Sequence, residues 1–252
     1  MPSLPHRDHL EQQHTPTAIA ARLGQARKHS YLGDTVFGAI DGTVTTFAVV
    51  AGVSGAHLEP MVALVLGLTN LLADGFSMAV GNYLSTKSER QLVEQARRIE
   101  EHHIDTIPEG EREEIRQIFA GKGFDGEILD SVVEVITEDR ERWVDTMVAE
   151  EFGLMLHGPS PLRAALTTFV AFVVAGMIPI LPFCFDLTSG GSVAFQSSAV
   201  ATGVTFFCIG LFKGRLLGQS SLRSGLETLL MGGAAATLAY VAGLWLRGLL
   251  AS

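Results

Sequence analysis

Five long apolar stretches run through this sequence and limit what it can fold into. A helix needs about 20 mostly apolar residues to cross the roughly 30 Å hydrocarbon core of a bilayer. The stretches are Leu32–Ser54, Pro60–Leu84, Leu162–Phe185, Ser197–Phe212 (extendable to Leu217) and Gly225–Leu249. With hydrophobic residues at 47% of the chain, a soluble bundle would have to bury all five. The sequence therefore predicts an all-α membrane protein with five transmembrane helices, the third of which is expected to kink or end at Pro179 and Pro182.

Charge is concentrated between the second and third apolar stretches. The segment from Leu84 to Ser160 holds nine Lys/Arg and 19 Asp/Glu, a formal charge of −10, whereas the whole chain carries −9. Helix signals divide this segment. The run "STKSERQLVEQARRIEEHHI" continues the second span without a breaker, and further helices are predicted from Thr106 or Pro108 to Gly121 or Gly123, over Phe124–Ile136 and over Thr137–Leu156. We expect a cytosolic acidic metal-binding domain of three or four helices, inserted between spans two and three.

The predicted organisation has four parts. Residues 1–30 form a polar cytosolic N-terminal tail, 31–84 spans one and two, 85–160 the acidic domain, and 161–252 spans three to five. Basic residues in short loops favour the cytosolic side. They precede the first span and follow the fourth, in "KGRLLGQSSLRS", but are absent from "GAHLEP" and "DLTSGGSVAFQ". The N-terminus and the acidic domain are therefore expected inside, and the C-terminus outside.

Two carboxylates lie well away from the ends of the predicted spans, Asp41 in the first and Asp74 in the second. Acids in a bilayer usually mark an ion or proton path, although hydroxyls such as Thr43 or Thr45 could merely cap them. Asp34, nearer the inner end, is expected to be an interfacial or capping residue. A stripe at i, i+4 spacing follows one face of the second span and predicts a lined path, with core packing as the alternative. The stripe consists of Asn70, Asp74, Met78 and Asn82.

The acidic segment carries several pairs of metal-ligand type at helical spacing. They are Glu100 with His103, Glu111 with Glu114, and Met147 with Glu151, beside Glu150. Carboxylate and imidazole at Glu-x-x-His spacing are how helical bundles assemble di-iron sites. An ordinary solvated helix face remains the alternative for each single pair.

The same composition excludes several classes. An acidic chain lacks the basic face that nucleic acid requires. "GKGFDG" lacks the Lys-Ser/Thr ending of a phosphate-binding loop, and the two cysteines, Cys184 and Cys208, sit in apolar runs with no CxxC. No tightly bound cofactor is expected. The expected partners are the lipid bilayer, protons and divalent metal ions.

Three segments together resemble the vacuolar iron transporter family: "DGTVTTFAVVAGVSGA", "LADGFSMAVGNYLSTKSE" and the acidic insert. The resemblance covers nearly the whole chain after about Ser30. It implies a five-span homodimer, here a bacterial homologue in the inner membrane. Such a protein would export Fe²⁺, and often Mn²⁺, Co²⁺ or Zn²⁺, from the cytosol in exchange for protons. The path would lie at the dimer interface, with the cytosolic domain collecting metal as substrate.

The resemblance also assigns residues. Asp41 and Met78 match path positions of the family, and further matches are to its metal-binding positions: Glu100, Glu111, Glu114, Met147 and Glu151. The chain departs from the pattern at three places. Asn70 replaces a path glutamate, for which Asp74 could substitute one turn later, His103 stands where a glutamate is expected, and Val148 where a second methionine is expected. Imidazole suits borderline metals, so His103 could favour Zn²⁺ or Co²⁺ slightly.

Two other functions remain open at this stage. The insert could be a membrane-tethered di-iron oxidase, which Glu-x-x-His suggests, although the acids within the spans would then have no role. Alternatively, metal bound to the insert could act as a signal to a partner, making the protein a sensor. A transporter is the function that gives a role both to the carboxylates within the spans and to the ligand-type residues of the insert.

Overall fold

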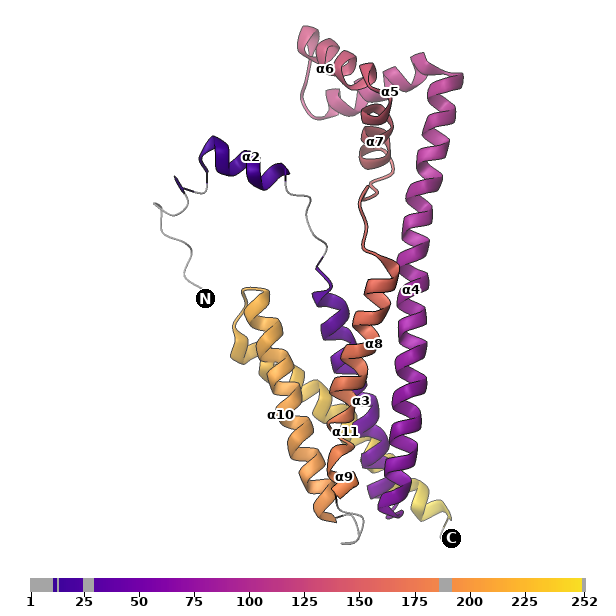
Figure 1. Cartoon of the computed structure of the whole chain (residues 1–252), viewed down its shortest axis with the longest axis vertical. Coiled ribbons are helices and arrows are strands. Elements are labelled where there is room, and N and C mark those ends of the chain that lie inside the picture. The colour runs from indigo at the N-terminus through magenta and orange to yellow at the C-terminus, as the bar shows by residue number, and fades with distance from the viewer. Residues whose placement is uncertain (1–10, 13, 25–29, 186–191, 251–252) are drawn as a thin grey trace. The chain divides into compact units, whose positions relative to one another are not determined.

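The computed structural model describes residues 11–12, 14–24, 30–185 and 192–250, and within them the chain is helical with no strand (Figure 1). The chain forms two compact units: Met1–Asn82 with Leu162–Ser252, and Tyr83–Pro161. Much of the predicted N-terminal tail lies outside the described residues, but Pro16–Gly24 forms helix α2. The first six residues of the predicted loop "DLTSGGSVAFQ", 186–191, lie outside them as well. The rest of that loop was predicted wrongly, because helix α10 (Ser192–Leu216) already begins at Ser192.

The first unit contains most of the apolar helices. These are α3 (Leu32–Gly55), the first half of α4 (Pro60–Thr106), α8 (Pro161–Met177), α9 (Leu181–Phe185), α10 (Ser192–Leu216) and α11 (Ser221–Leu250). Among the described residues, four helices are long and apolar enough to cross a membrane, namely α3, α4, α10 and α11. Many of their large side chains are exposed, as expected of helices that face lipid. The chain thus has the helices of a multi-pass membrane protein.

The third apolar stretch is not one continuous helix, and this is where the structure departs from the predicted five spans. Helix α8 has 17 residues and ends at Met177, and the short α9 follows. Pro179 and Pro182 lack the N–H that would continue the helix, and their rings obstruct the preceding turn. The carbonyl oxygen of Pro179, released by this break, accepts a buried hydrogen bond of 2.7 Å from Ser198 Oγ of α10. The break predicted from the two prolines is confirmed.

Glycines let the helices of the first unit approach at backbone distance. A Cβ added to Gly42 of α3 would lie 2.3 Å from the carbonyl oxygen of Phe172 in α8. One added to Gly38 would lie 2.5 Å from the carbonyl oxygen of Thr168. Close approach of this kind, through small residues, is the usual basis of helix packing in membranes.

We expect Gly42→Ala to destabilise the protein strongly, because the atom in its way belongs to backbone that cannot rotate aside. Overpacking usually costs about 1–3 kcal/mol, and a backbone clash belongs at the upper end. Gly33→Ala in the same helix is the matched control, since an added Cβ there meets nothing within 4 Å. Thermal unfolding in detergent should show a clear drop in Tm for Gly42→Ala alone; equal Tm values for the two variants would contradict the packing described.

The second unit contains the end of α4 followed by α5 (Pro108–Gly121), α6 (Gly126–Glu138) and α7 (Arg140–Glu150). The predicted continuation of the second span into the acidic segment is confirmed, because α4 is a single helix of 47 residues. The predicted helix over Thr137–Leu156 is wrong at both ends. Asp139 caps α7 by accepting a hydrogen bond of 2.8 Å from the backbone N–H of Arg142, and the chain turns away near Gly153, which has a φ of 64°.

An apolar core holds these four helices together. It includes Ile104 of α4, Ile115 of α5, Val133 of α6 and Val144 of α7, all buried. The acidic segment therefore folds around an apolar core of its own, which lies beneath its charged surface.

Candidate metal site

The turn between α4 and α5 brings three ligand-type side chains together. Glu100 and His103 lie one turn apart near the end of α4, and Glu111 lies in the first turn of α5. Pro108 at the first position of α5 supplies a φ suited to a helix start, so the chain reverses within a few residues. One ligand atom from each of the three side chains lies within 4.8 Å of the other two. We call these three residues the carboxylate–imidazole cluster.

Both carboxylates of the cluster are buried without hydrogen bonds. Glu100 and Glu111 are each 1% exposed, and none of their four carboxylate oxygens has a hydrogen-bond partner. His103 Nδ1 lies 3.2 Å from Glu111 Oε1 and 3.8 Å from Glu100 Oε1, on a side chain that is 44% exposed. An unpaired buried charge is costly, so a proton or a cation would stabilise this arrangement.

The proton affinities of the cluster reflect this cost. Burial, followed by the negative charge of Glu111, raises the pKa of the Glu100 carboxyl to about 8. Burial and the charge of Glu114 raise the pKa of Glu111, against the opposing effect of His103. Desolvation, then the charges of Glu114 and Glu111, also raises the pKa of Glu151. Glu114 and Glu151 therefore add negative charge around the cluster, as the sequence pairs suggested.

Two other predicted ligands lie in different surroundings. Met147 is fully buried in the apolar core of the second unit, with Trp143 and Val148 in the same core. Glu150 forms an ion pair with Lys122. The structure thus brings together Glu100, His103 and Glu111, with Glu114 and Glu151 acting on them electrostatically.

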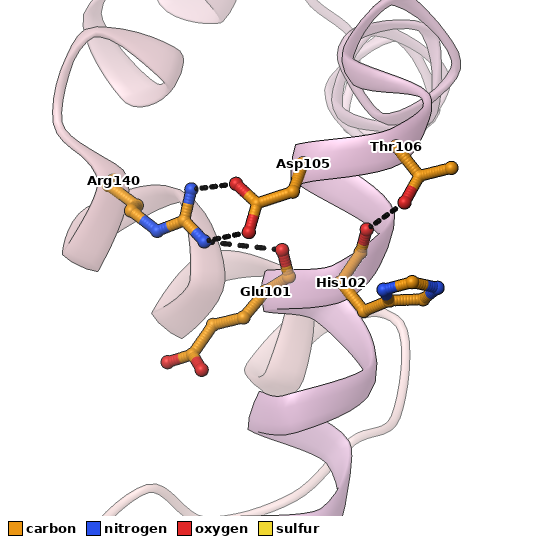
Figure 2. A network of polar contacts seen from close by, with 5 residues as sticks. All are labelled: Glu101, His102, Asp105, Thr106 and Arg140. Atoms are coloured by element: carbon orange, nitrogen blue, oxygen red, sulfur yellow. Dashed lines mark hydrogen bonds and ion pairs between the residues drawn. The ribbon is translucent and has the colours of Figure 1, made fainter.

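An ion pair at the end of α4 fixes the start of α7 (Figure 2). The Arg140 guanidinium donates two hydrogen bonds to the Asp105 carboxylate, of 2.5 and 2.8 Å, and a third of 3.2 Å to the carbonyl oxygen of Glu101. The contact lowers the pKa of Asp105. Paired hydrogen bonds of this geometry orient an arginine well, so Arg140 sets where α7 begins relative to the α4 turn that carries Glu100 and His103. Sequence spacing gave no sign of this contact.

The carboxylates of the apolar helices also interact. Asp41 of α3 and Asp74 of α4 are both half-buried, and their negative charges act on one another. Asn70, Met78 and Asn82 are half-buried as well, which fits a single face of α4. Met78 packs beside the buried Leu71–Phe172–Ile180 cluster. Packing is therefore part of its role in this structure.

Asp34 makes a contact that the sequence did not predict. Asn82 Nδ2 of α4 donates hydrogen bonds of 2.7 Å to Asp34 Oδ1 of α3 and to Thr168 Oγ1 of α8. The amide thereby joins three helices at the end of the polar stripe. Asp34 stands seven residues before Asp41, two helical turns along α3, and that spacing was the available signal.

These observations define a class: a multi-pass helical membrane protein with carboxylates inside its apolar helices and a buried oxygen–nitrogen cluster suited to a divalent cation. The model of the VIT family matches residues 32–244, and the chain belongs to that family. It is 36% identical to a vacuolar iron transporter of Toxoplasma gondii over 221 residues, which cover 84% of this chain and 73% of that protein. It is also 33% identical to vacuolar iron transporter 1 of Arabidopsis thaliana over 208 residues, 82% of each chain.

Proposed function

We propose that this protein exports Fe²⁺ from the cytosol in exchange for protons. The observation that carries the proposal is the carboxylate–imidazole cluster, in a chain whose relatives are named vacuolar iron transporters. Family membership favours a metal transporter over an enzyme. Iron as the substrate and protons as the counter-ion are our inference.

The second unit would act as the cytosolic collector of metal. Its segment carries −10, and such a field raises the local concentration of cations. Glu100 and Glu111 supply four buried oxygens without a hydrogen-bond partner, beside the imidazole of His103, and Glu114 and Glu151 add charge around them. A bound Fe²⁺ would satisfy these buried oxygens.

The first unit would provide the path. Asp41 and Asp74 repel one another, so a cation or protons must neutralise them when they are shielded from water. Metal arriving from the inner side and protons arriving from the outer side would then compete for the same two carboxylates. This competition is the basis of exchange. Asn70, Met78 and Asn82 continue the polar face on which these ions would move.

We further propose five crossings, a cytosolic N-terminus and collector, an external C-terminus and a homodimer in the cell membrane. The broken third stretch, α8 with α9, would supply the fifth crossing, since Pro161 to Phe185 together hold enough residues for one. Exposed apolar side chains on α4 such as Leu72 and Phe76 offer a surface for lipid or a second copy.

Reconstituted vesicles test the exchange directly. With a proton gradient and an Fe²⁺-sensitive dye, wild-type protein is expected to move iron, and a protonophore or Asp41→Ala should reduce movement to the level of protein-free vesicles. Transport that survives both changes would refute proton exchange. Transport by purified protein alone would also separate a transporter from a metal sensor.

An oxidase is supported less well. A di-iron bundle takes a Glu-x-x-His motif from each of two helices, whereas the described residues hold one group of three ligand-type side chains. Stoichiometric O₂ consumption after anaerobic loading with Fe²⁺ would nevertheless identify an oxidase.

A further inference from the structure

We propose that His103 sets the metal preference of the carboxylate–imidazole cluster, favouring Fe²⁺, Co²⁺ and Zn²⁺ over Mn²⁺. This deepens the proposed function, on which it rests for the role of the cluster as collector. The proposal names a substrate class: divalent transition metals that accept imidazole nitrogen.

The donor set is the first argument. Of the three grouped side chains, two offer oxygen and His103 alone offers nitrogen. Sites of carboxylate and water oxygen suit Mg²⁺, Ca²⁺ and Mn²⁺, whereas imidazole suits Fe²⁺ and Zn²⁺. Removing the imidazole would leave only oxygen donors among these three side chains, so discrimination against Mn²⁺ is expected to fall.

Met147 is the second point to consider. A thioether also favours softer metals, and Met147 is as deeply buried as the two glutamates, in the core that includes Trp143 and Val144. Val148, in the same core, offers no donor atom. Because Met147 is present in the wild type and in every His103 variant, a difference between them in the ratio of Fe²⁺ to Mn²⁺ affinity reports the imidazole.

The geometry is the third argument. His103 Nδ1 approaches oxygens of both buried glutamates, at 3.2 and 3.8 Å. Its ring is 44% exposed while the carboxylates are 1% exposed, so the imidazole forms the solvent side of the cluster. An ion entering from solvent would meet this nitrogen together with the two carboxylates.

A different role for the same geometry must be separated from this one. A protonated His103 could act as a fixed counter-ion that neutralises Glu100 and Glu111 and competes with metal. The two roles predict opposite effects of removing the ring. Loss of a ligand weakens metal binding, whereas loss of a competing positive charge strengthens it.

Competitive binding to the full-length protein in detergent tests the proposal. Fe²⁺ is titrated anaerobically against Mn²⁺, and free Mn²⁺ is followed by electron paramagnetic resonance. His103→Gln is expected to weaken Fe²⁺ binding at least about tenfold, the lower end of what even outer-shell changes cost at metal sites, with little change for Mn²⁺. His103→Glu should raise the affinity for Mn²⁺ relative to that for Fe²⁺.

Two controls isolate the cluster. His102→Gln changes the exposed neighbouring imidazole and should leave both affinities unaltered. Metal that still binds to the double variant Glu100→Gln/Glu111→Gln is bound elsewhere in the chain. This amount is subtracted from the binding of the other variants.

Tighter Fe²⁺ binding by His103→Gln would overturn the proposal in favour of the counter-ion, and an unchanged Fe²⁺ to Mn²⁺ ratio would overturn it outright. Because binding is measured at equilibrium without a membrane or gradient, the result does not depend on whether transport is proton-coupled. A vesicle experiment that fails would refute exchange and leave this preference standing.

Discussion

Vesicles containing the Asp74→Asn protein are expected to accumulate no iron under a proton gradient. Asp74 is half-buried on the polar face of α4 and interacts with Asp41, so replacing it with an amide of nearly the same size removes one titratable charge with little change in packing. The initial rate of dye response measures the effect. Glu227→Gln in α11, an exposed acid paired with Arg223, is the matched control and should transport normally.

A second variant makes this test sharper. If Asp74 supplies the charge that the family resemblance leads us to expect at position 70, then Asn70→Glu should restore transport to Asp74→Asn at least in part. Both residues are half-buried and one turn apart on the same face of α4. Normal transport by Asp74→Asn alone would rule out the residue as part of the path. Loss without rescue would leave Asp74 essential but not exchangeable with position 70.

The second large effect is a loss of stability with rising pH in the metal-free protein. Burial raises the pKa of Glu100 to about 8 in the folded state, above its usual value near 4.5. The folded protein therefore binds an extra proton between these values, and its stability falls as pH rises from about 5 to 8. A pKa difference of one corresponds to about 1.4 kcal/mol. The free energy of unfolding is therefore expected to fall by more than about 1.4 kcal/mol as pH rises from about 5 to 8.

Metal should reverse this trend, because it competes with protons for the same carboxylates. Zn²⁺ is used because it has no redox chemistry, unlike Fe²⁺. It is expected to stabilise the protein far more at pH 8 than at pH 5. Trp143 lies in the core of the second unit and is 4% exposed, so its fluorescence in a Trp245→Phe background reports unfolding of that unit. Glu100→Gln/Glu111→Gln should abolish both the pH slope and the Zn²⁺ effect; an unchanged slope would place its origin elsewhere.

Sequence patterns predicted the helices well where a helix is determined locally. Hydropathy and the absence of helix breakers predicted α3, α10, α11 and the continuous α4. Pro179 and Pro182 predicted the break after α8. Hydropathy could not show that this break leaves α8 only 17 residues long. The end of α7 at Glu150 was also missed, although Gly153, with its φ of 64°, is the type of residue that often follows a helix end.

The candidate site was predictable in its parts but not in its assembly. Glu-x-x-His spacing places Glu100 and His103 on one face of any helix, whereas their meeting with Glu111 depends on the turn around Ile107. Met147 was predicted as a ligand from its helical spacing to Glu151. It lies in the apolar core of the second unit, and its role as a ligand stays a prediction. The bond between Asn82 and Asp34 joins residues 48 apart in the chain, which no local pattern encodes.

The glycine contacts of α3 have a mechanical consequence. Gly38 and Gly42 seat the helix against the backbone of α8, while a Cβ at Gly55 would lie 2.5 Å from the carbonyl oxygen of Tyr240 in α11. Packed cores of this kind resist continuous deformation. The contacts with α8 and α11 make α3, which carries Asp41, part of one rigid group of helices. If access to Asp41 alternates between the two sides of a membrane, we expect α3, α8 and α11 to move as one body and the other helices to move relative to them.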